Sequence, residues 1–191
     1  MVKAILFDWH GVLDDTKLED LFKKTAQASS IPLKTVKSHL SDVARQYALG
    51  FMDADQFWLQ LRTVANLSGK QTNFLRRYIN SIEKNELLWK FLPEINKKYT
   101  LAILSDCPLE KSETIRKKIP LTVFALTLFS AEVHKDKKMK EFFFLASDAL
   151  GLKPHECLFV DDSSKNTFFA KEIGFLTHQF RTTEEFIKYM A

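Results

Sequence analysis

Acidic and hydroxyl side chains directly follow three apolar runs of this sequence. Asp8 ends the run "AILFD", Ser105 ends "LAILS", and the pair Asp161–Asp162 ends "LFVDD". A lysine-rich stretch, residues 135–138, follows another apolar run. If these runs are parallel strands, their carboxyl ends meet at one edge of a sheet, which is the edge where open α/β sheets bind ligands. We therefore expect three carboxylates, a hydroxyl and an ammonium group to gather there.

Such a group of side chains has a definite chemistry. Clustered carboxylates repel one another unless a cation lies among them, and oxygen ligands of this kind favour Mg²⁺. A further carboxylate close to the metal can attack phosphorus and form an aspartyl-phosphate. The lysine and the metal would then offset the charge of the transferred phosphoryl group. Each residue alone fits a helix cap, a turn or a solvated loop, so the prediction depends on their joint placement at strand ends.

The elements that must position these residues follow from the hydrophobic pattern. Compact apolar runs typical of buried strands span residues 2–7, 99–105, 124–130, 156–161 and 175–180. Helical patterns separate the last four runs, including one over residues 109–118. This alternation predicts an α/β fold with a five-stranded parallel sheet and helices on both faces. Gly11 follows the first strand where no helix ends, so we expect a special backbone turn there.

Only helical patterns lie between the first and the second predicted strand. The four patterns begin near Thr16, Pro32, Asp53 and Thr72. The first and the third of them open with the spacing of a capping box. The sequence therefore predicts an all-helical cap inserted at the carboxyl end of a strand, above the candidate site. We assign residues 1–15 and 83–191 to the sheet domain and residues 16–82 to the cap.

Composition and charge narrow the classes of partner. The net charge is +4, and the basic residues are spread along helical patterns; the one cluster, residues 135–140, is interrupted by Asp136 and lacks interleaved aromatic residues. The two cysteines lie far apart, without metal-ligand spacing. No signal-peptide pattern and no apolar segment of membrane-spanning length is present. We expect a cytoplasmic protein that binds neither nucleic acid nor membranes, and its oligomeric state is not readable from the sequence.

At these residues the chain resembles the haloacid dehalogenase superfamily, and the resemblance covers nearly all of it. That superfamily consists mostly of phosphatases with a Rossmann-like core and a cap inserted after the first strand. Its first motif, Asp-x-Asp-Gly-Thr/Val-Leu, is similar to "DWHGVL", with Asp8 in the position of the nucleophile. Its second motif, a Ser or Thr that ends the second strand, is similar to Ser105. The size and position of the cap resemble the helical-cap subclass.

The third and fourth motifs are similar to "SAEVHKDKK" and "GLKPHECLFVDDSSKN". The third motif places its lysine at Lys137, with Lys135 as the alternative amine. The resemblance implies that Lys137, Ser105 and Asp106 lie at the phosphoryl group. It also implies a magnesium site made by Asp8, Asp162, the backbone carbonyl of His10 and Asp161, the last as a direct or an outer ligand.

His10 departs from the family pattern, because phosphatases of the superfamily have a second aspartate there. That aspartate protonates the leaving oxygen and then deprotonates the attacking water. In one interpretation His10 takes over this role, since imidazole has an unperturbed pKa of about 6.5, although a nearby divalent cation disfavours the imidazolium. In another, the proton transfer is lost, which costs on the order of 10² to 10⁴ in rate.

A third interpretation is another chemistry of the superfamily. Its dehalogenases work without metal, which the intact "VDD" argues against. A phosphonatase-like reaction would need a cap lysine, and nothing in the sequence distinguishes Lys17, Lys23 and Lys24. We predict a Mg²⁺-dependent phosphatase of a small phosphorylated metabolite that acts through an aspartyl-phosphate on Asp8, with His10 as the acid and base. The alternative is a catalytically impaired binding or regulatory protein with the same fold.

Overall fold

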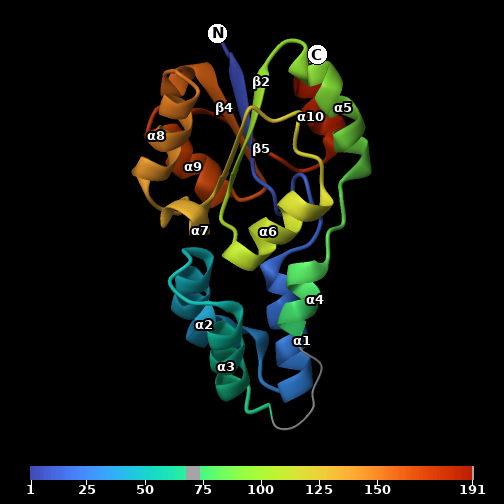
Figure 1. Ribbon diagram of the computed structural model, residues 1–191, viewed down its shortest axis with the longest axis vertical. Helices are drawn as coiled ribbons and strands as arrows, with labels where there is room; N and C mark the ends of the chain where they lie inside the picture. Colours follow the sequence, from blue (N-terminus) through green and yellow to red (C-terminus); the bar gives the residue numbers. More distant parts are fainter. Residues whose placement is uncertain (68–73, 191) are drawn as a thin grey trace.

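The computed structural model describes residues 1–67 and 74–190, and a five-stranded parallel sheet lies at its centre (Figure 1). The strand order is β3-β2-β1-β4-β5, so the first strand of the chain lies in the middle. All four pairs of neighbouring strands are parallel. The strands are β1 (Ala4–Phe7), β2 (Thr100–Ser105), β3 (Leu126–Phe129), β4 (Cys157–Asp161) and β5 (Leu176–Gln179). This architecture confirms the predicted α/β, Rossmann-like fold.

Helices cover both faces of the sheet. Residues of β1 alternate between the two faces, with Ile5 and Phe7 on one side and Ala4 and Leu6 on the other. The first face packs against α5 (Glu86–Asn96), α6 (Leu109–Lys118) and α10 (Thr183–Met190). The second face packs against α8 (Lys140–Ala149) and α9 (Ser164–Glu172). Two short helices, α7 (Ser130–Val133) and the 3₁₀ turn Pro154–Glu156, complete this part.

Among the described residues, four helices form the cap, which lies beyond the carboxyl ends of the strands (Figure 1). They are α1 (Leu18–Ser29), α2 (Leu33–Ala48), α3 (Ala54–Val64) and α4 (Phe74–Asn80). The cap has a hydrophobic cluster of its own, in which the rings of Tyr47 and Phe57 stack at 4.6 Å. A separate core supports the division at residues 15/16 and 82/83, which stays a prediction. No helix among the described residues has the length and apolar character needed to cross a membrane.

The local predictions differ from the structure at two helix starts. The Asp53–Gln56 capping box forms at the start of α3. The one predicted at Thr16 does not form: α1 starts at Leu18 without a side-chain cap. The Thr16 hydroxyl donates instead to the buried Asp14 carboxylate (2.5 Å), which competes for it. Ser130, predicted to end a strand, begins α7, and the predicted start of the fourth helix at residue 72 lies outside the described residues.

The chain crosses between sheet domain and cap twice, and the two crossings are hydrogen-bonded to each other. The Asp15 amide donates to the Glu83 carbonyl (2.8 Å), and the Asn85 amide donates to the Leu13 carbonyl (3.1 Å). The buried carboxylate of Asp14 accepts from the Glu83 amide (2.7 Å). These hydrogen bonds hold the two crossings together.

A buried lysine of α6 fastens the second crossing. Lys111 is fully buried, and its ammonium group donates to the backbone carbonyls of Tyr78 (3.1 Å) and Ser81. The carboxylate of Asp14 lies 3.8 Å from the same nitrogen. Burial lowers the pKa of Lys111, although the charge of Asp14 opposes this effect. Lys111 thus connects the sheet domain to the end of α4 through neutral acceptors.

Candidate active site

The Asp8 side chain lies at the carboxyl end of β1 with one of its oxygens fully engaged. Oδ1 accepts from the Trp9 amide (2.7 Å), the Ser105 hydroxyl (2.7 Å) and the Lys137 ammonium group (2.6 Å). Within the described part of the chain, no hydrogen bond to Oδ2 is present. Three donors on one oxygen fix the rotation of the carboxylate and leave the other oxygen available. The Trp9 ring lies in the core, where it is fully buried.

Lys137 links two of the strand-end carboxylates. Its side chain is 2% exposed, and its nitrogen lies 2.6 Å from Asp8 and 2.7 Å from Asp161. Burial disfavours its charge, but the two carboxylates outweigh this effect and raise the pKa of Lys137. Burial and the charge of Asp161 raise the pKa of Asp8, and Lys137 opposes that rise. Lys135, the alternative amine, is half-buried and does not line the cavity described below.

The two acidic residues of the fourth motif have different surroundings. Asp161 is fully buried and accepts from the Ser163 amide (2.7 Å), the Asn166 side chain (3.0 Å) and Lys137. The Asp162 side chain is 30% exposed and forms an ion pair with Lys17 of the cap (2.5 Å). Asp161 is therefore held by donors, whereas Asp162 faces the space between sheet domain and cap.

These carboxylates fit a magnesium ion. Ligand oxygens of Asp8, Asp161 and Asp162 all lie within 4.8 Å of one another. Three carboxylates so close together match the oxygen ligands that Mg²⁺ prefers. The donors around Asp161 suit an outer position, and the more open Asp162 suits direct contact.

Gly11 allows Asp162 to approach the first motif. Its φ is +82°, which favours glycine, and a Cβ atom there would lie 2.3 Å from Asp162 Oδ2. It would also lie 2.9 Å from the nitrogen of Lys17. The special turn predicted after the first strand is thus confirmed.

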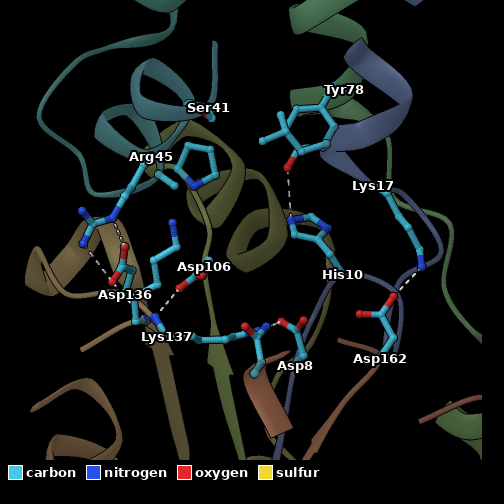
Figure 2. Close-up of a pocket in the computed structure, with 16 residues that line it drawn as sticks. Asp8, His10, Lys17, Ser41, Arg45, Tyr78, Asp106, Asp136, Lys137 and Asp162 are labelled. Atoms are coloured by element: carbon cyan, nitrogen blue, oxygen red, sulfur yellow. Dashed lines mark hydrogen bonds and ion pairs between the residues drawn. The ribbon is translucent and has the colours of Figure 1, made fainter. Parts of the chain in front are cut away.

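His10 lies at the site, but both of its ring nitrogens face protein groups. Nδ1 is 3.0 Å from the Thr16 carbonyl, and Nε2 is 3.2 Å from the Tyr78 hydroxyl (Figure 2). Burial lowers the pKa of His10 to about 4, the charge of Lys111 acts in the same direction, and Asp14 opposes both. The ring is therefore neutral near pH 7, and its hydrogen bonds connect the first motif to both ends of the cap.

A cavity of about 360 Å³ lies between the sheet domain and the cap, and Figure 2 shows residues that line it. The cap contributes Lys17, Ser41, Arg45 and Tyr78, among others. The sheet domain contributes Asp8, His10, Asp106, Asp136, Lys137 and Asp162, among others. Ser105 does not line this cavity. It is fully buried, and its contact with the site is the hydrogen bond from its hydroxyl to Asp8.

Arg45, Tyr78 and Asp136 are among the residues of this cavity that sequence reasoning did not identify. Arg45 forms an ion pair with Asp136 (2.5 Å) and so joins the cap to the loop that bears Lys137. Tyr78 bonds to His10 from the cap. The only signal for Asp136 was its place beside Lys137, and Arg45 and Tyr78 lie on ordinary amphipathic helices. Of the three cap lysines considered above, Lys17 alone lines this cavity.

Comparisons with known proteins show the family and the fold. A model of the haloacid dehalogenase-like hydrolase family matches residues 2–174. A D-ribitol-5-phosphate phosphatase of Bacteroides thetaiotaomicron is 28% identical, over 94% of this chain and 92% of its own. A haloacid dehalogenase family enzyme of the same organism, solved with magnesium and inorganic phosphate, has a TM-score of 0.81 at 20% identity over 100% of both chains. An L-2-haloacid dehalogenase of Xanthobacter autotrophicus has a TM-score of 0.66 at 19% identity, over 100% of this chain and 82% of its own.

Proposed function

Because the chain belongs to the haloacid dehalogenase-like hydrolases, we propose that it is a magnesium-dependent phosphatase of a small phosphomonoester. The observation that carries this proposal is the arrangement of Asp8. One carboxylate oxygen is held by three donors, and the other has none among the described residues, at the floor of a cavity of about 360 Å³. A carboxylate fixed in this way is suited to attack a phosphorus atom placed above it.

In the proposed reaction, Asp8 Oδ2 attacks phosphorus while the bond from phosphorus to the leaving oxygen breaks. The leaving oxygen takes a proton from solvent water and departs as an alcohol. A water molecule then attacks the phosphorus of the aspartyl-phosphate and gives up a proton to solvent, and the bond from phosphorus to Asp8 breaks, which releases inorganic phosphate and free Asp8. Lys137 lies beside Asp8 and offsets negative charge on the phosphoryl oxygens. Ser105 acts by holding Asp8, since its hydroxyl donates to that carboxylate. Asp106 lines the cavity beside Lys137, whose amide donates to its carboxylate (3.0 Å).

Asp8, Asp162 and the backbone carbonyl of His10 would hold the magnesium ion, with Asp161 as an outer partner. When bound, the ion supplies positive charge next to the phosphoryl oxygens. Lys137 is not a metal ligand, because its ammonium group has no lone pair to offer.

The contacts of His10 favour the interpretation in which proton transfer is impaired. A ring whose two nitrogens bond to Thr16 and Tyr78 has no free nitrogen for the leaving oxygen. The same observation favours the second candidate function, a binding protein with this fold and little or no turnover. Loss of a general acid or base costs on the order of 10² to 10⁴ in rate, which leaves slow but measurable hydrolysis.

The relative named a D-ribitol-5-phosphate phosphatase suggests phosphates of sugar alcohols as the first substrates to test. The experiment measures phosphate release from a panel of such esters, with Mg²⁺ and with a chelator. Turnover that requires Mg²⁺ and is lost in Asp8→Asn is the expected result. His10→Asp, which restores a carboxylate at this position, is expected to raise the rate. If the wild-type protein is inactive and only His10→Asp releases phosphate, the binding protein is the better description.

A further inference from the structure

The Tyr78 hydroxyl is the polar group that α4 contributes to the cavity. Tyr78 is 7% exposed, and it lines the cavity on the side of the cap, opposite the sheet edge (Figure 2). The buried ammonium group of Lys111 lies 5.1 Å from the centre of its ring and forms a cation–π contact with it. The position of the hydroxyl is therefore defined by packing as well as by its hydrogen bond.

The hydrogen-bond partners of His10 determine what this hydroxyl can offer. The Thr16 carbonyl can only accept, so Nδ1 of His10 carries the ring proton. Nε2 is then an acceptor, and the Tyr78 hydroxyl donates its one proton to it. With that proton engaged, the Tyr78 oxygen can only accept a hydrogen bond from a molecule in the cavity.

The charges that line the cavity favour a neutral, hydrogen-bond-donating occupant. Three of the four cationic side chains among the lining residues already face carboxylates: Lys17 faces Asp162, Arg45 faces Asp136, and Lys137 faces Asp8. The fourth, Lys138, is exposed to solvent. A second anionic group on a substrate would thus meet carboxylates, whereas a hydroxyl group would find acceptors.

We propose that the Tyr78 hydroxyl, oriented by His10, accepts a hydrogen bond from a hydroxyl group of the substrate and makes Tyr78 a specificity-determining residue. This proposal rests on the proposed phosphatase function and deepens it. It assigns His10 a positioning role, in which the histidine sets the polarity of the tyrosine oxygen. The substrate class is a phosphomonoester with a neutral, hydroxylated organic part.

The test compares D-ribitol 5-phosphate with p-nitrophenyl phosphate, which has no hydroxyl group. Tyr78→Phe removes the hydroxyl group, which means both the acceptor oxygen and the proton that it donates to His10. It is expected to lower kcat/KM for D-ribitol 5-phosphate by roughly 3- to 10-fold, the effect of one neutral hydrogen bond. The value for p-nitrophenyl phosphate is expected to stay unchanged. Tyr47→Phe is the matched control, because Tyr47 is a buried cap tyrosine that does not line this cavity; it should alter neither substrate.

A thermodynamic cycle with monodeoxy analogues of D-ribitol 5-phosphate identifies the hydroxyl concerned. Removal of that one hydroxyl should weaken the reaction of the wild-type enzyme and have no further effect on Tyr78→Phe. A purely structural role of Tyr78 would give equal losses with every substrate, and this result would overturn the proposal while the phosphatase function stands. An unchanged kcat/KM of Tyr78→Phe for D-ribitol 5-phosphate would also overturn the proposal. If the wild-type protein hydrolyses no phosphomonoester, the proposed function itself fails and this inference with it.

Discussion

Two buried lysines of this protein have opposite surroundings. Lys137 lies between the carboxylates of Asp8 and Asp161, at 2.6 and 2.7 Å. Lys111 donates to two backbone carbonyls, and the nearest carboxylate, that of Asp14, is 3.8 Å away. Accordingly, the pKa of Lys137 is raised, against the effect of burial. The pKa of Lys111 is lowered, in the direction in which burial acts.

The different partners of the two lysines correspond to two different expected roles, one in the reaction and one in the structure. Lys137 keeps a charge among acidic groups at the floor of the cavity, where a phosphoryl group would need it. Lys111 uses an equally buried ammonium group to hold the crossing between sheet domain and cap through neutral acceptors. In the proposed phosphatase, the same residue type would therefore serve the reaction at Lys137 and the connection between sheet domain and cap at Lys111, depending on its partners.

Replacement of Lys137 tests the chemical half of this comparison and should have the largest effect. Lys137→Met removes the ammonium group beside Asp8, and we expect kcat/KM to fall by roughly 10²-fold or more. Lys140→Met is the matched control, since Lys140 is an exposed lysine of the same segment that does not line the cavity; the activity of this variant should stay within the same order of magnitude. Steady-state phosphate release measures both. Equal losses in the two variants would mean that Lys137 has no special role.

Replacement of Lys111 tests its structural role at the crossing between sheet domain and cap. Lys111→Met leaves the carbonyls of Tyr78 and Ser81 without this donor, and we expect the free energy of unfolding to fall by roughly 2–4 kcal/mol. The activity per folded molecule should change far less than in Lys137→Met. Urea unfolding with Lys117→Met, an exposed residue of the same helix, as control gives the measurement. A loss of activity as large as that of Lys137→Met, without a loss of stability, would contradict the division between the two lysines.

Magnesium should distinguish the surroundings of the two lysines, because the carboxylate cluster lies beside Lys137 and not beside Lys111. At ten times its dissociation constant, Mg²⁺ should stabilise the folded protein by about 1.4 kcal/mol. Lys111→Met should retain this gain, and Asp162→Asn should lose most of it. Thermal unfolding with Mg²⁺ and with a chelator checks this expectation. An undiminished gain in Asp162→Asn would place the ion elsewhere.

The smallest effect concerns alkaline pH. The pKa of Lys111 is lower in the folded protein than its usual value of about 10.4. Between these two values the unfolded chain binds more protons, so stability relative to Lys111→Met rises as the pH increases through this window. Unfolding free energies of both proteins from pH 8 upward measure the difference. A difference that shrinks with pH would mean that Lys111 is stabilised as a cation.

Most of the strands, and the residues at their ends, could be predicted from the local hydrophobic pattern of the sequence. The short apolar runs gave the strands to within two residues, because nearly every residue of β1, β2 and β4 is buried. Asp8, Ser105 and Asp161 were identified because each ends such a run, and strand ends meet whatever the loops do. The Asp53–Gln56 capping box also formed, since both of its bonds lie within one helical turn.

The tertiary structure alone decided which groups face each other across the chain. Thr16 bonds to Asp14 and not to its helix, and His10 turns to Tyr78, 68 residues away. Nothing in the helix that contains Lys111 distinguishes it from its solvated neighbours, because burial of a lysine depends on elements from elsewhere in the sequence. Local periodicity fixes strands, helices and the residues at their ends; the partners of a polar side chain depend on packing between distant segments.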